Sequence, residues 1–428
     1  MPVPKVHDIG LAPSNELTMN AVYLLGTGMT RFAAHPELTL KQLARHAIDE
    51  ALSDAGLQPR DIEFAAVGNA TQGALQGQHA IRGQVLLRDF GIEAIPVLNV
   101  ENACATGSTA LHVAALQIRS GAVDCALALG AEKMVIDDKA RALALFDSGW
   151  DIETPQANVR ELCGSYFDPA EVFAAEGRRR SMFMDLYGAM ARHHMEAFGT
   201  TREQLAAVAE KNHWHSTFNP NAQFRRAMTL RQILDAPVVS GPLTVPMCAP
   251  LSDGAAAVVL VSERWLRRLG ATRALRLRAS VLRTGSRRDP RDYAHHLCHL
   301  AARDAYAQAG VGPDDIDVAE VHDAAAFGEI LQSECLGFCA FGEGGALAES
   351  GATRLGGRIP INTSGGLESK GHPLGATGLG QIHELALQLR GEAGTRQVEG
   401  ARLGVAENGG GLLGVEEAVA CITILGKE

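Results

Sequence analysis

The turn that carries Cys104 is the first part of the sequence that could perform chemistry. In residues 100–107, which read VENACATG, an apolar segment ends in a turn of small residues, and a long predicted helix follows. A thiol at a helix N-terminus lies near unpaired N–H groups and the positive end of the helix dipole, which favours its thiolate form. The turn therefore predicts a nucleophile, with a buried and unreactive cysteine as the alternative.

Two histidines could work with this thiol. His372 lies in the glycine-rich segment NTSGGLESKGHPLGATG, just before a second predicted helix. A Cys–His pair is a standard way to make a nucleophilic thiolate. His322 follows the apolar segment 316–321 and begins the sequence HDAAAF. A neutral histidine there could donate a hydrogen bond to a thioester oxygen as negative charge develops, or it could cap the next helix.

An internal repeat indicates how these residues are brought together. Residues 47–62 and 301–316 share a helix, an Ala-Gly end and a proline turn, at an offset of 254 (301 minus 47). Residues 105–119 and 376–390 share Ala-Thr-Gly, a His, and an Ala-Leu-Gln…Arg end, at an offset of 271 (376 minus 105). Two matches in the same order indicate a duplicated unit. The turns before the two paired helices would then face each other at the centre.

The pattern of apolar segments predicts the organisation of the chain. Short Val/Ile/Leu/Ala segments alternate with longer helical patterns, which predicts an α/β fold with mostly parallel sheets covered by helices. We expect an N-terminal extension at residues 1–20, an N-terminal half at 21–135 plus 236–265, and a C-terminal half at 266–428. Residues 136–235 interrupt the shared pattern, so we expect them to form an inserted helical subdomain.

Four motifs, taken in order, resemble those of the thiolase superfamily. They are CATG at Cys104, VHD at His322, NTSGGLESKGHPLGATGLGQ at His372, and AENGGGLLG near the C-terminus. The His-Asp pair and the CAPLSDG segment at 248–254 resemble the sterol-carrier-protein-type thiolases. The resemblance covers nearly the whole chain from about residue 21. It implies a thiolase fold, in which a duplicated α/β unit forms a layered αβαβα arrangement with an inserted helical loop subdomain.

The resemblance also implies roles for the motif residues. Cys104 would take the acyl group, His372 would activate the thiol, and His322 would form an oxyanion hole with a water or a backbone N–H. Gly410 and Gly411 would supply backbone loops at this oxyanion site.

For coenzyme A, the resemblance implies a site in the inserted subdomain. Arg178, Arg179 and Arg180 are the candidates to contact its phosphates, and a solvated helix face is the alternative explanation of this arginine run. No permanently bound cofactor is expected, because the coenzyme A thioester is the substrate.

The sequence departs from the family at the second acid/base. Classical thiolases carry a cysteine in a Cys-x-Gly-Gly-Gly motif, where this chain has Glu407. Sterol-carrier-type members can place a cysteine directly after His-Asp, where this chain has Ala324, and Ala325 replaces their usual phenylalanine. A carboxyl group in an apolar, glycine-lined site has a raised pKa and makes a better general base. Glu407 is therefore the predicted base, or alternatively a loop-bracing carboxylate.

Composition excludes several other classes. The net charge of −10 (39 Lys+Arg, 49 Asp+Glu) disfavours nucleic-acid binding, and the longest apolar stretch, at 254–261, is too short to cross a membrane. No secretory signal is visible, and eight scattered cysteines are typical of a reduced compartment, so a cytoplasmic location is expected. His295 and His299 would share a surface helix face without completing a ligand set, so no metal is expected.

The leading functional prediction is an acyl-CoA C-acyltransferase of lipid metabolism. It would perform Claisen condensation, or thiolytic cleavage of a 3-oxoacyl-CoA, through an acyl-Cys104 intermediate. One alternative is a condensing enzyme or lyase for an unusual acyl-CoA that uses Glu407 as base. Another is a thiolase-like subunit active only with a small OB-fold partner protein. The resemblance implies a homodimer or a dimer of dimers.

Overall fold

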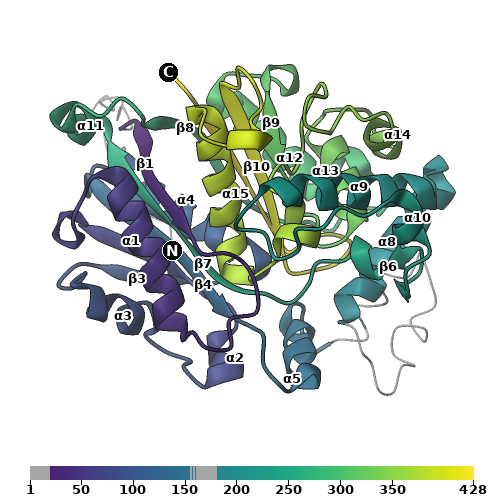
Figure 1. The fold of residues 1–428 in the computed structure, drawn as a ribbon, viewed down its shortest axis with the longest axis horizontal. Helices are drawn as coiled ribbons and strands as arrows, with labels where there is room; N and C mark the ends of the chain where they lie inside the picture. Colours follow the sequence, from purple (N-terminus) through teal and green to yellow (C-terminus); the bar gives the residue numbers. More distant parts are fainter. Residues whose placement is uncertain (1–19, 155–156, 158–159, 161–180) are drawn as a thin grey trace, which may run out of the picture.

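The computed structural model describes residues 20–154, 157, 160 and 181–428 (Figure 1). The predicted N-terminal extension therefore lies almost wholly outside the described residues, and so do Arg178, Arg179 and Arg180. Within the described part, no helix has the length and apolar content needed to cross a membrane.

A single sheet of nine strands runs through the molecule, in the order β3-β2-β4-β7-β1-β8-β11-β10-β9. The first five strands in this order are β3 (Val97–Val100), β2 (Phe64–Gly68), β4 (Cys125–Lys133), β7 (Asp253–Ser262) and β1 (Val22–Met29). The other four are β8 (Leu275–Thr284), β11 (Val419–Gly426), β10 (Leu403–Gly410) and β9 (Val318–Glu320).

The expectation of mostly parallel sheets was wrong. Only the β2–β3, β2–β4 and β9–β10 pairs are parallel, while the five pairs from β4 across to β10 are antiparallel. The strands β4, β7 and β11 are buried along nearly their whole length. A strand buried on both faces is apolar at every position, so its residue pattern carries no information about its direction.

The duplicated unit is visible in the strand order. The first half has the order β3-β2-β4-β7-β1, and the second half repeats it as residue 361, β9, β10, β11 and β8. Ile361 pairs in parallel with Ala319 of β9, as β3 does with β2. The two halves meet where β1 pairs with β8 at Leu24–Leu275.

Helices complete five layers. Helix α1 (Leu40–Ala55) covers the outer face of the first half, and α12 (Leu297–Ala309) covers the outer face of the second. Helices α4 (Thr106–Arg119) and α15 (Leu374–Arg390) lie together between the halves (Figure 1). Three apolar clusters fill the interfaces between these layers: one lies on each outer face, and the third surrounds the central helices on both sides. This confirms the αβαβα thiolase fold.

The outer helices end as the repeat predicts. Helix α1 begins at Thr39, whose side chain accepts a hydrogen bond from the backbone of Gln42 in a capping box. It ends at Gly56, and α12 ends at Gly310, both in the left-handed conformation that favours glycine. The Ala-Gly pair in each copy is therefore a helix C-terminus.

The two central helices pack at an unusually short distance. A Cβ atom on Gly107 of α4 would lie 2.7 Å from the carbonyl oxygen of Gly375 on α15. A Cβ atom on Gly130 of β4 would lie only 1.9 Å from the same oxygen. Such separations are far below van der Waals contact, so only glycine fits there. These glycines bring the beginnings of α4 and α15 together.

The stretch between β4 and β7 is mainly helical where the structure describes it. Its helices are α5 (Lys139–Ala144), α8 (Met182–Phe198), α9 (Arg202–His215) and α10 (Leu230–Leu234), followed by the short hairpin β5–β6 (Val238–Ser240, Leu243–Thr244). We keep the boundaries at 1–20, 21–135 plus 236–265, 136–235 and 266–428 as a proposal.

The remaining helices surround this core. Three short ones in the first half are α2 (Gln72–Gln76), α3 (Arg82–Leu87) and α11 (Glu263–Leu269). In the second half, α13 (Ala326–Cys335) follows the His322 loop, and α14 (Gly344–Glu349) lies in the longer connection of that half. Helices α13, α14 and α9 pack on one another beside the predicted site.

Candidate active site

The Cys104 turn is a strained junction between β3 and α4. A single helical turn at Ala103–Ala105 leads into α4, and Ala103 has a φ of +48°, a conformation that non-glycine residues rarely adopt. Strand β10 approaches closely from behind, since a Cβ on Gly410 would lie 2.2 Å from the carbonyl oxygen of Asn102. The predicted residue Gly410 thus allows the second half to pack against the turn and fix it.

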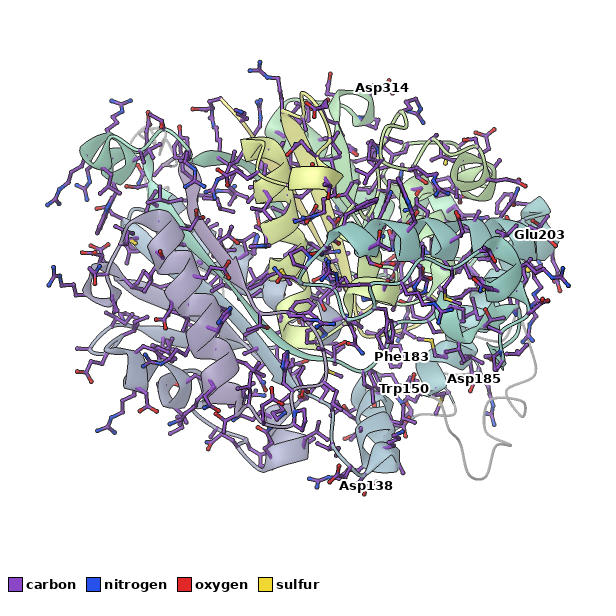
Figure 2. The ribbon with its side chains drawn as sticks, in the orientation of Figure 1. Asp138, Trp150, Phe183, Asp185, Glu203 and Asp314 are labelled. Atoms are coloured by element: carbon purple, nitrogen blue, oxygen red, sulfur yellow. The ribbon has the colours of Figure 1, made fainter. Side chains whose placement is uncertain are left out.

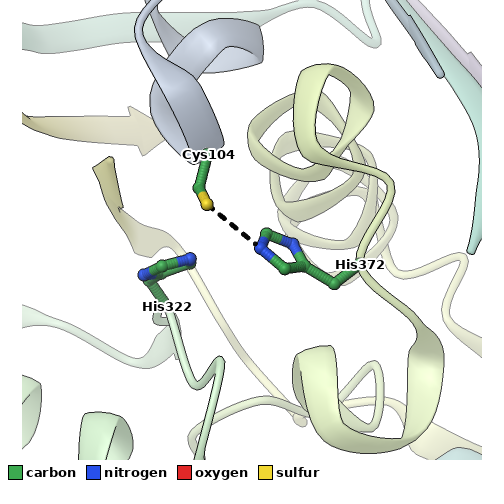
Figure 3. A group of neighbouring side chains, drawn as sticks. All are labelled: Cys104, His322 and His372. Carbon is green, nitrogen blue, oxygen red and sulfur yellow. Dashed lines mark hydrogen bonds between the residues drawn. The ribbon is translucent and has the colours of Figure 1, made fainter. Parts of the chain in front are cut away.

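The two predicted turns meet at the centre of the molecule. His372 Nε2 lies 3.3 Å from Cys104 Sγ, as the dashed line in Figure 3 shows. His372 Nδ1 lies 2.7 Å from Thr377 Oγ1, and that hydroxyl donates to the carbonyl of Pro373 at 3.0 Å. Because the hydroxyl proton is used there, Thr377 accepts from Nδ1–H. Nε2 is then unprotonated and faces the thiol as an acceptor.

The electrostatics of this pair differ from the sequence-based expectation of a favoured thiolate. Burial, with a smaller contribution from Glu101, raises the pKa of Cys104 to about 12, although backbone N–H groups including that of Gly411 oppose the shift. Burial also holds the pKa of His372 well below its usual value, with His322 and Lys370 adding repulsion. The resting pair is therefore a neutral thiol beside a neutral imidazole, and the proton must move as the sulfur attacks.

His322 completes the group. Its ring lies 5.2 Å from the His372 ring between centroids, and Figure 3 shows it facing the same space. Burial lowers the pKa of His322 to about 4, so the ring is neutral. Both ring nitrogens are buried and have no hydrogen-bond partner among the described residues. A buried, unpaired donor facing a thiol is what an oxyanion site needs.

An apolar cavity opens in front of these three residues, with a volume of about 270 Å³. Gly411, the second predicted backbone residue, lies in its wall. Phe183 belongs to the cavity wall and stacks on Trp150 behind it, with ring centroids 5.7 Å apart; Figure 2 labels the two residues below the centre of the molecule. The other large wall residues are Leu143, Phe146, Met184, Tyr187, Phe224, Val245 and Leu251.

Glu407, the predicted base, lies outside this wall. It is fully buried on β10, where it accepts a hydrogen bond from the backbone N–H of His322 at 2.9 Å. Its other oxygen lies 3.7 Å from the thiol of Cys298. Burial, and then the nearby charge of Glu417, raises the pKa of Glu407 to about 8. Glu407 is not one of the described residues that line the cavity, so its role as base stays a proposal.

Sequence reasoning missed one acidic residue of the site, Glu417. It lies before β11 and lines the cavity together with Cys104, His322 and His372. The available signal was the Glu416–Glu417 pair in an otherwise apolar, glycine-rich stretch. Cys248 also lines the cavity, next to Ala324. The carbonyl of Ala324 accepts the N–H of Ala249, which ties the two segments together.

The histidine-rich stretch before α12 is not a simple surface helix as expected. His295 precedes the helix, is exposed and pairs with Asp292, while His296 and Cys298 are buried. Ligand-type atoms of His296, Cys298 and Glu417 lie within 4.8 Å of one another, as do those of Cys104, His322 and His372. In the first group, His296 Nδ1 already accepts the N–H of Cys298. The expectation of no metal stays a prediction.

Two family models match the chain. The thiolase N-terminal domain model matches residues 22–238, and the thiolase C-terminal domain-like model matches residues 280–427. The chain belongs to the thiolase family. The sequence-based prediction of an acyltransferase of this family is therefore confirmed.

Curated relatives point in the same direction. The acetyl-CoA acetyltransferase of Methanothermobacter thermautotrophicus is 38% identical, over 92% of this chain and 97% of that protein. Sterol carrier protein 2 of Homo sapiens is 37% identical, over 95% of this chain and 72% of that protein. The benzoylsuccinyl-CoA thiolase subunit BbsB of Thauera aromatica is 34% identical, over 88% of this chain and 91% of that protein.

Solved structures share the fold. The Ltp2-ChsH2(DUF35) aldolase aligns with a TM-score of 0.74 and 24% identity, over 96% of this chain and 98% of that chain. Human mitochondrial 3-ketoacyl-CoA thiolase in complex with CoA aligns with a TM-score of 0.69 and 18% identity, over 96% of this chain and 99% of that chain. At these identities the likeness supports the fold alone.

Proposed function

We propose that this protein is an acyl-CoA C-acyltransferase that works through an acyl-Cys104 intermediate. The supporting observation is the contact between Cys104 Sγ and His372 Nε2 at 3.3 Å, with the unpaired ring of His322 facing the same cavity. Nucleophile, base and oxyanion donor come from three segments that are distant in the sequence. Their convergence on one apolar cavity is the arrangement that acyl transfer requires.

In the first half-reaction, Cys104 Sγ attacks the thioester carbonyl of the acyl-CoA while His372 Nε2 takes the thiol proton. The carbonyl oxygen becomes negative and receives a hydrogen bond from the His322 ring, with the backbone at Gly410 and Gly411 nearby. Collapse of this intermediate breaks the C–S bond to coenzyme A, and the departing thiolate takes the proton from His372. The acyl group is then held as a thioester on Cys104.

The cavity wall supports an apolar acyl group as the substrate. Its large lining residues are aromatic and aliphatic, and a volume of about 270 Å³ accommodates more than an acetyl group. A role in lipid metabolism follows from this preference. For coenzyme A itself, we retain Arg178, Arg179 and Arg180 as proposed phosphate contacts. No cofactor besides the coenzyme A thioester is proposed.

A second candidate function is a condensing enzyme or lyase, or a subunit that acts only with a small OB-fold partner. The observation that favours it is Ala324, which lies in the cavity wall where a second catalytic cysteine would be expected. One relative is a thiolase subunit by name, and one structural neighbour is an aldolase assembled with a DUF35 protein. We further propose a cytoplasmic homodimer or dimer of dimers.

The test is acylation of Cys104. The purified protein is incubated with acetyl-, hexanoyl- and benzoyl-CoA, and acyl adducts are measured by intact mass and located by peptide mapping. We expect one adduct on Cys104, with greater yield for the larger acyl groups, and none in Cys104→Ala. An adduct on Cys248, or no adduct with any of the three thioesters, would contradict the proposal. An adduct that is released only after a partner protein is added would favour the second candidate.

A further inference from the structure

We infer that Glu417, and not Glu407, is the acid/base that exchanges a proton with the α-carbon of the acyl-CoA. This inference rests on the proposed function. It starts from position: Glu417 lines the cavity that also contains Cys104 Sγ and the His322 ring, while Glu407 lies behind the backbone of His322. A group that removes a proton must reach the substrate, and of these two carboxyls only Glu417 borders the space that the substrate would occupy.

The hydrogen bonds of the two glutamates point to different tasks. Glu407 accepts the His322 N–H at 2.9 Å, a bond that fixes the loop carrying the oxyanion donor. Glu417 Oε1 accepts from Gln332 Nε2 at 3.2 Å, and its Oε2 lies 3.9 Å from Cys298 Sγ and 3.8 Å from His296 Nε2. The backbone N–H of Glu417 also donates to the carboxyl group. One oxygen is therefore held by Gln332, and the other makes no short hydrogen bond to a side chain among the described residues.

The contact that Glu407 makes resembles that of a bracing carboxyl group in the first half. In the first half, Glu132 on β4 occupies the corresponding strand and accepts hydrogen bonds from the loop that follows β2. Glu407 on β10 accepts from the loop that follows β9. Both carboxyl groups therefore brace the loop that follows a neighbouring strand, although the strand registers place Glu132 opposite Gly410 in the repeat and not opposite Glu407. Glu417 follows the β10 strand, and among the described residues no hydrogen bond ties its side chain to the loop after β9.

The surroundings of Glu417 suit a group that both takes and gives a proton. Burial is the main reason that its pKa is raised to about 7, with Glu416 adding repulsion and Arg288 opposing it. A carboxyl with this pKa is present in both forms near neutral pH. The titratable and charged groups that face it are Tyr187 of α8, Arg288 before α12, His296 and Cys298 at the start of α12, Glu407 of β10, and the adjacent Glu416.

Glu417 also borders a second, smaller cavity on its other side. That cavity is lined by His193, Arg288, His296 and Glu416 as well as Glu417. The carboxyl group thus borders both the acyl cavity and a second cavity, whose wall combines these charged side chains with apolar residues such as Phe327 and Leu331.

The balanced step in condensation is as follows. The Glu417 carboxylate takes a proton from Cα of the second acyl-CoA, so the C–H bond breaks and the electron pair attacks the carbonyl carbon of acyl-Cys104. A C–C bond forms and the C–S bond to Cys104 breaks. The Cys104 thiolate then receives the proton that Glu417 took from Cα, passed on through His372 Nε2, so that Glu417 is again a carboxylate and Cys104 again a thiol. In the cleavage direction Glu417 returns its proton to the departing enolate carbon. No oxidant, metal or other reactant is required.

The test measures proton exchange separately from acylation. Wild type, Glu417→Gln and Glu407→Gln are incubated with hexanoyl-CoA in D₂O, and deuterium at Cα and the adduct on Cys104 are both followed by mass spectrometry. We expect Glu417→Gln to lose exchange by ~100-fold or more while Cys104 acylation changes by less than about threefold. Glu407→Gln should keep exchange within about tenfold, because it loses only a contact that positions His322.

Several outcomes would overturn the inference. Exchange that persists in Glu417→Gln, or that is lost in Glu407→Gln while Glu417→Gln retains it, assigns the base elsewhere. Absence of exchange in a wild-type protein that does acylate Cys104 also overturns it and leaves the first half-reaction intact. Failure of Cys104 to acylate instead refutes the proposed function. Glu417→Asp guards against misfolding: with a shortened carboxylate it should keep acylation and regain part of the exchange.

Discussion

The two halves of the fold contain equivalent loops, one after β2 and one after β9, that differ in their hydrogen bonding. In the first half, Glu132 accepts hydrogen bonds from residues 69–71 after β2 and from Gly375, so several donors converge on one carboxyl group. In the second half, Glu407 accepts one backbone N–H from the loop after β9, and the ring of His322 on that loop remains unpaired among the described residues. The loop after β2 is held by several hydrogen bonds to Glu132, whereas the loop after β9 leaves the His322 ring facing the cavity.

The difference shows how a duplicated scaffold can divide its tasks. The half with the saturated loop supplies the nucleophile, Cys104, on a rigid and strained turn. The other half supplies the base, His372, and the unpaired donor, His322. Saturated hydrogen bonds contribute stability, whereas an unpaired buried donor costs stability and is typical of functional sites.

The largest expected effect on the acylation rate comes from removing the Cys104–His372 contact between the halves. His372→Ala removes the acceptor for the Cys104 proton, so we expect the rate of Cys104 acylation to fall by ~10³–10⁴-fold. The rate is measured by quenched-flow mass spectrometry with hexanoyl-CoA. His383→Asn, on helix α15 that follows the His372 turn and also buried, is the control and should acylate at close to the wild-type rate. Equal loss in both variants would show damage to the helix rather than loss of a base.

A smaller loss is expected when the unpaired donor is removed. His322→Ala should slow acylation by about 10²–10³-fold, as loss of an oxyanion donor does. The stability of the protein should change little, because neither ring nitrogen of His322 has a hydrogen bond to a described residue that the substitution would remove. Asn69→Ala in the first half should instead lower stability and leave the acylation rate close to that of wild type, since Asn69 donates to Ala131 and Glu132. Thermal unfolding and acylation rates of both variants check this reversal.

Substitution of the two buried glutamates should change the free energy of unfolding by different amounts. Glu132→Gln places an amide where several donors converge, and we expect it to lower the free energy of unfolding by about 1.5–3 kcal/mol at pH 8. Urea denaturation measures this value. Glu407→Gln should cost less at pH 7, because a carboxyl with a pKa of about 8 is mostly protonated there and the amide resembles its neutral form. A larger loss for Glu407→Gln would contradict the comparison.

The smallest effect concerns pH. The pKa of Glu407 is raised from 4.5 to about 8 by burial and Glu417. Between these values the unfolded chain releases this proton while the folded protein keeps it, so the stability contribution falls as pH rises and levels off above about 8. The melting temperature of wild type should therefore decline more steeply from pH 5 to pH 8 than that of Glu407→Gln. Parallel curves would show that Glu407 is ionised in the folded protein.

Much of this site could be predicted from the sequence because the internal repeat indicates which segments lie opposite each other in space. Matching 105–119 with 376–390 places the Cys104 turn opposite the His372 turn, and the structure brings their side chains to 3.3 Å. The motif around His322 placed it at the end of a strand, where β9 in fact ends. These positions depend on which residues begin and end elements, and that information is local.

The rest depends on tertiary packing. The direction of the buried strand β7 could not be read from a residue pattern that is apolar throughout. The roles of Glu407 and Glu417 depend on which carboxyl faces the cavity, which is set by the β10–β11 connection and by Gln332 on α13. The thiol proton on Cys104 follows from burial, which outweighs the helix N-terminus in setting its pKa.

The glycines between α4 and α15 make the reactive spacing a property of the core. Gly107 of α4 and Gly130 of β4 both contact the carbonyl of Gly375, one turn from His372, where a single methyl group would push α15 away from α4 or β4. Moving the helices by even half an ångström would stretch the 3.3 Å sulfur–nitrogen contact beyond useful proton transfer. Evolution of this chain toward new acyl groups is therefore expected to change the aromatic cavity wall while these three positions stay fixed.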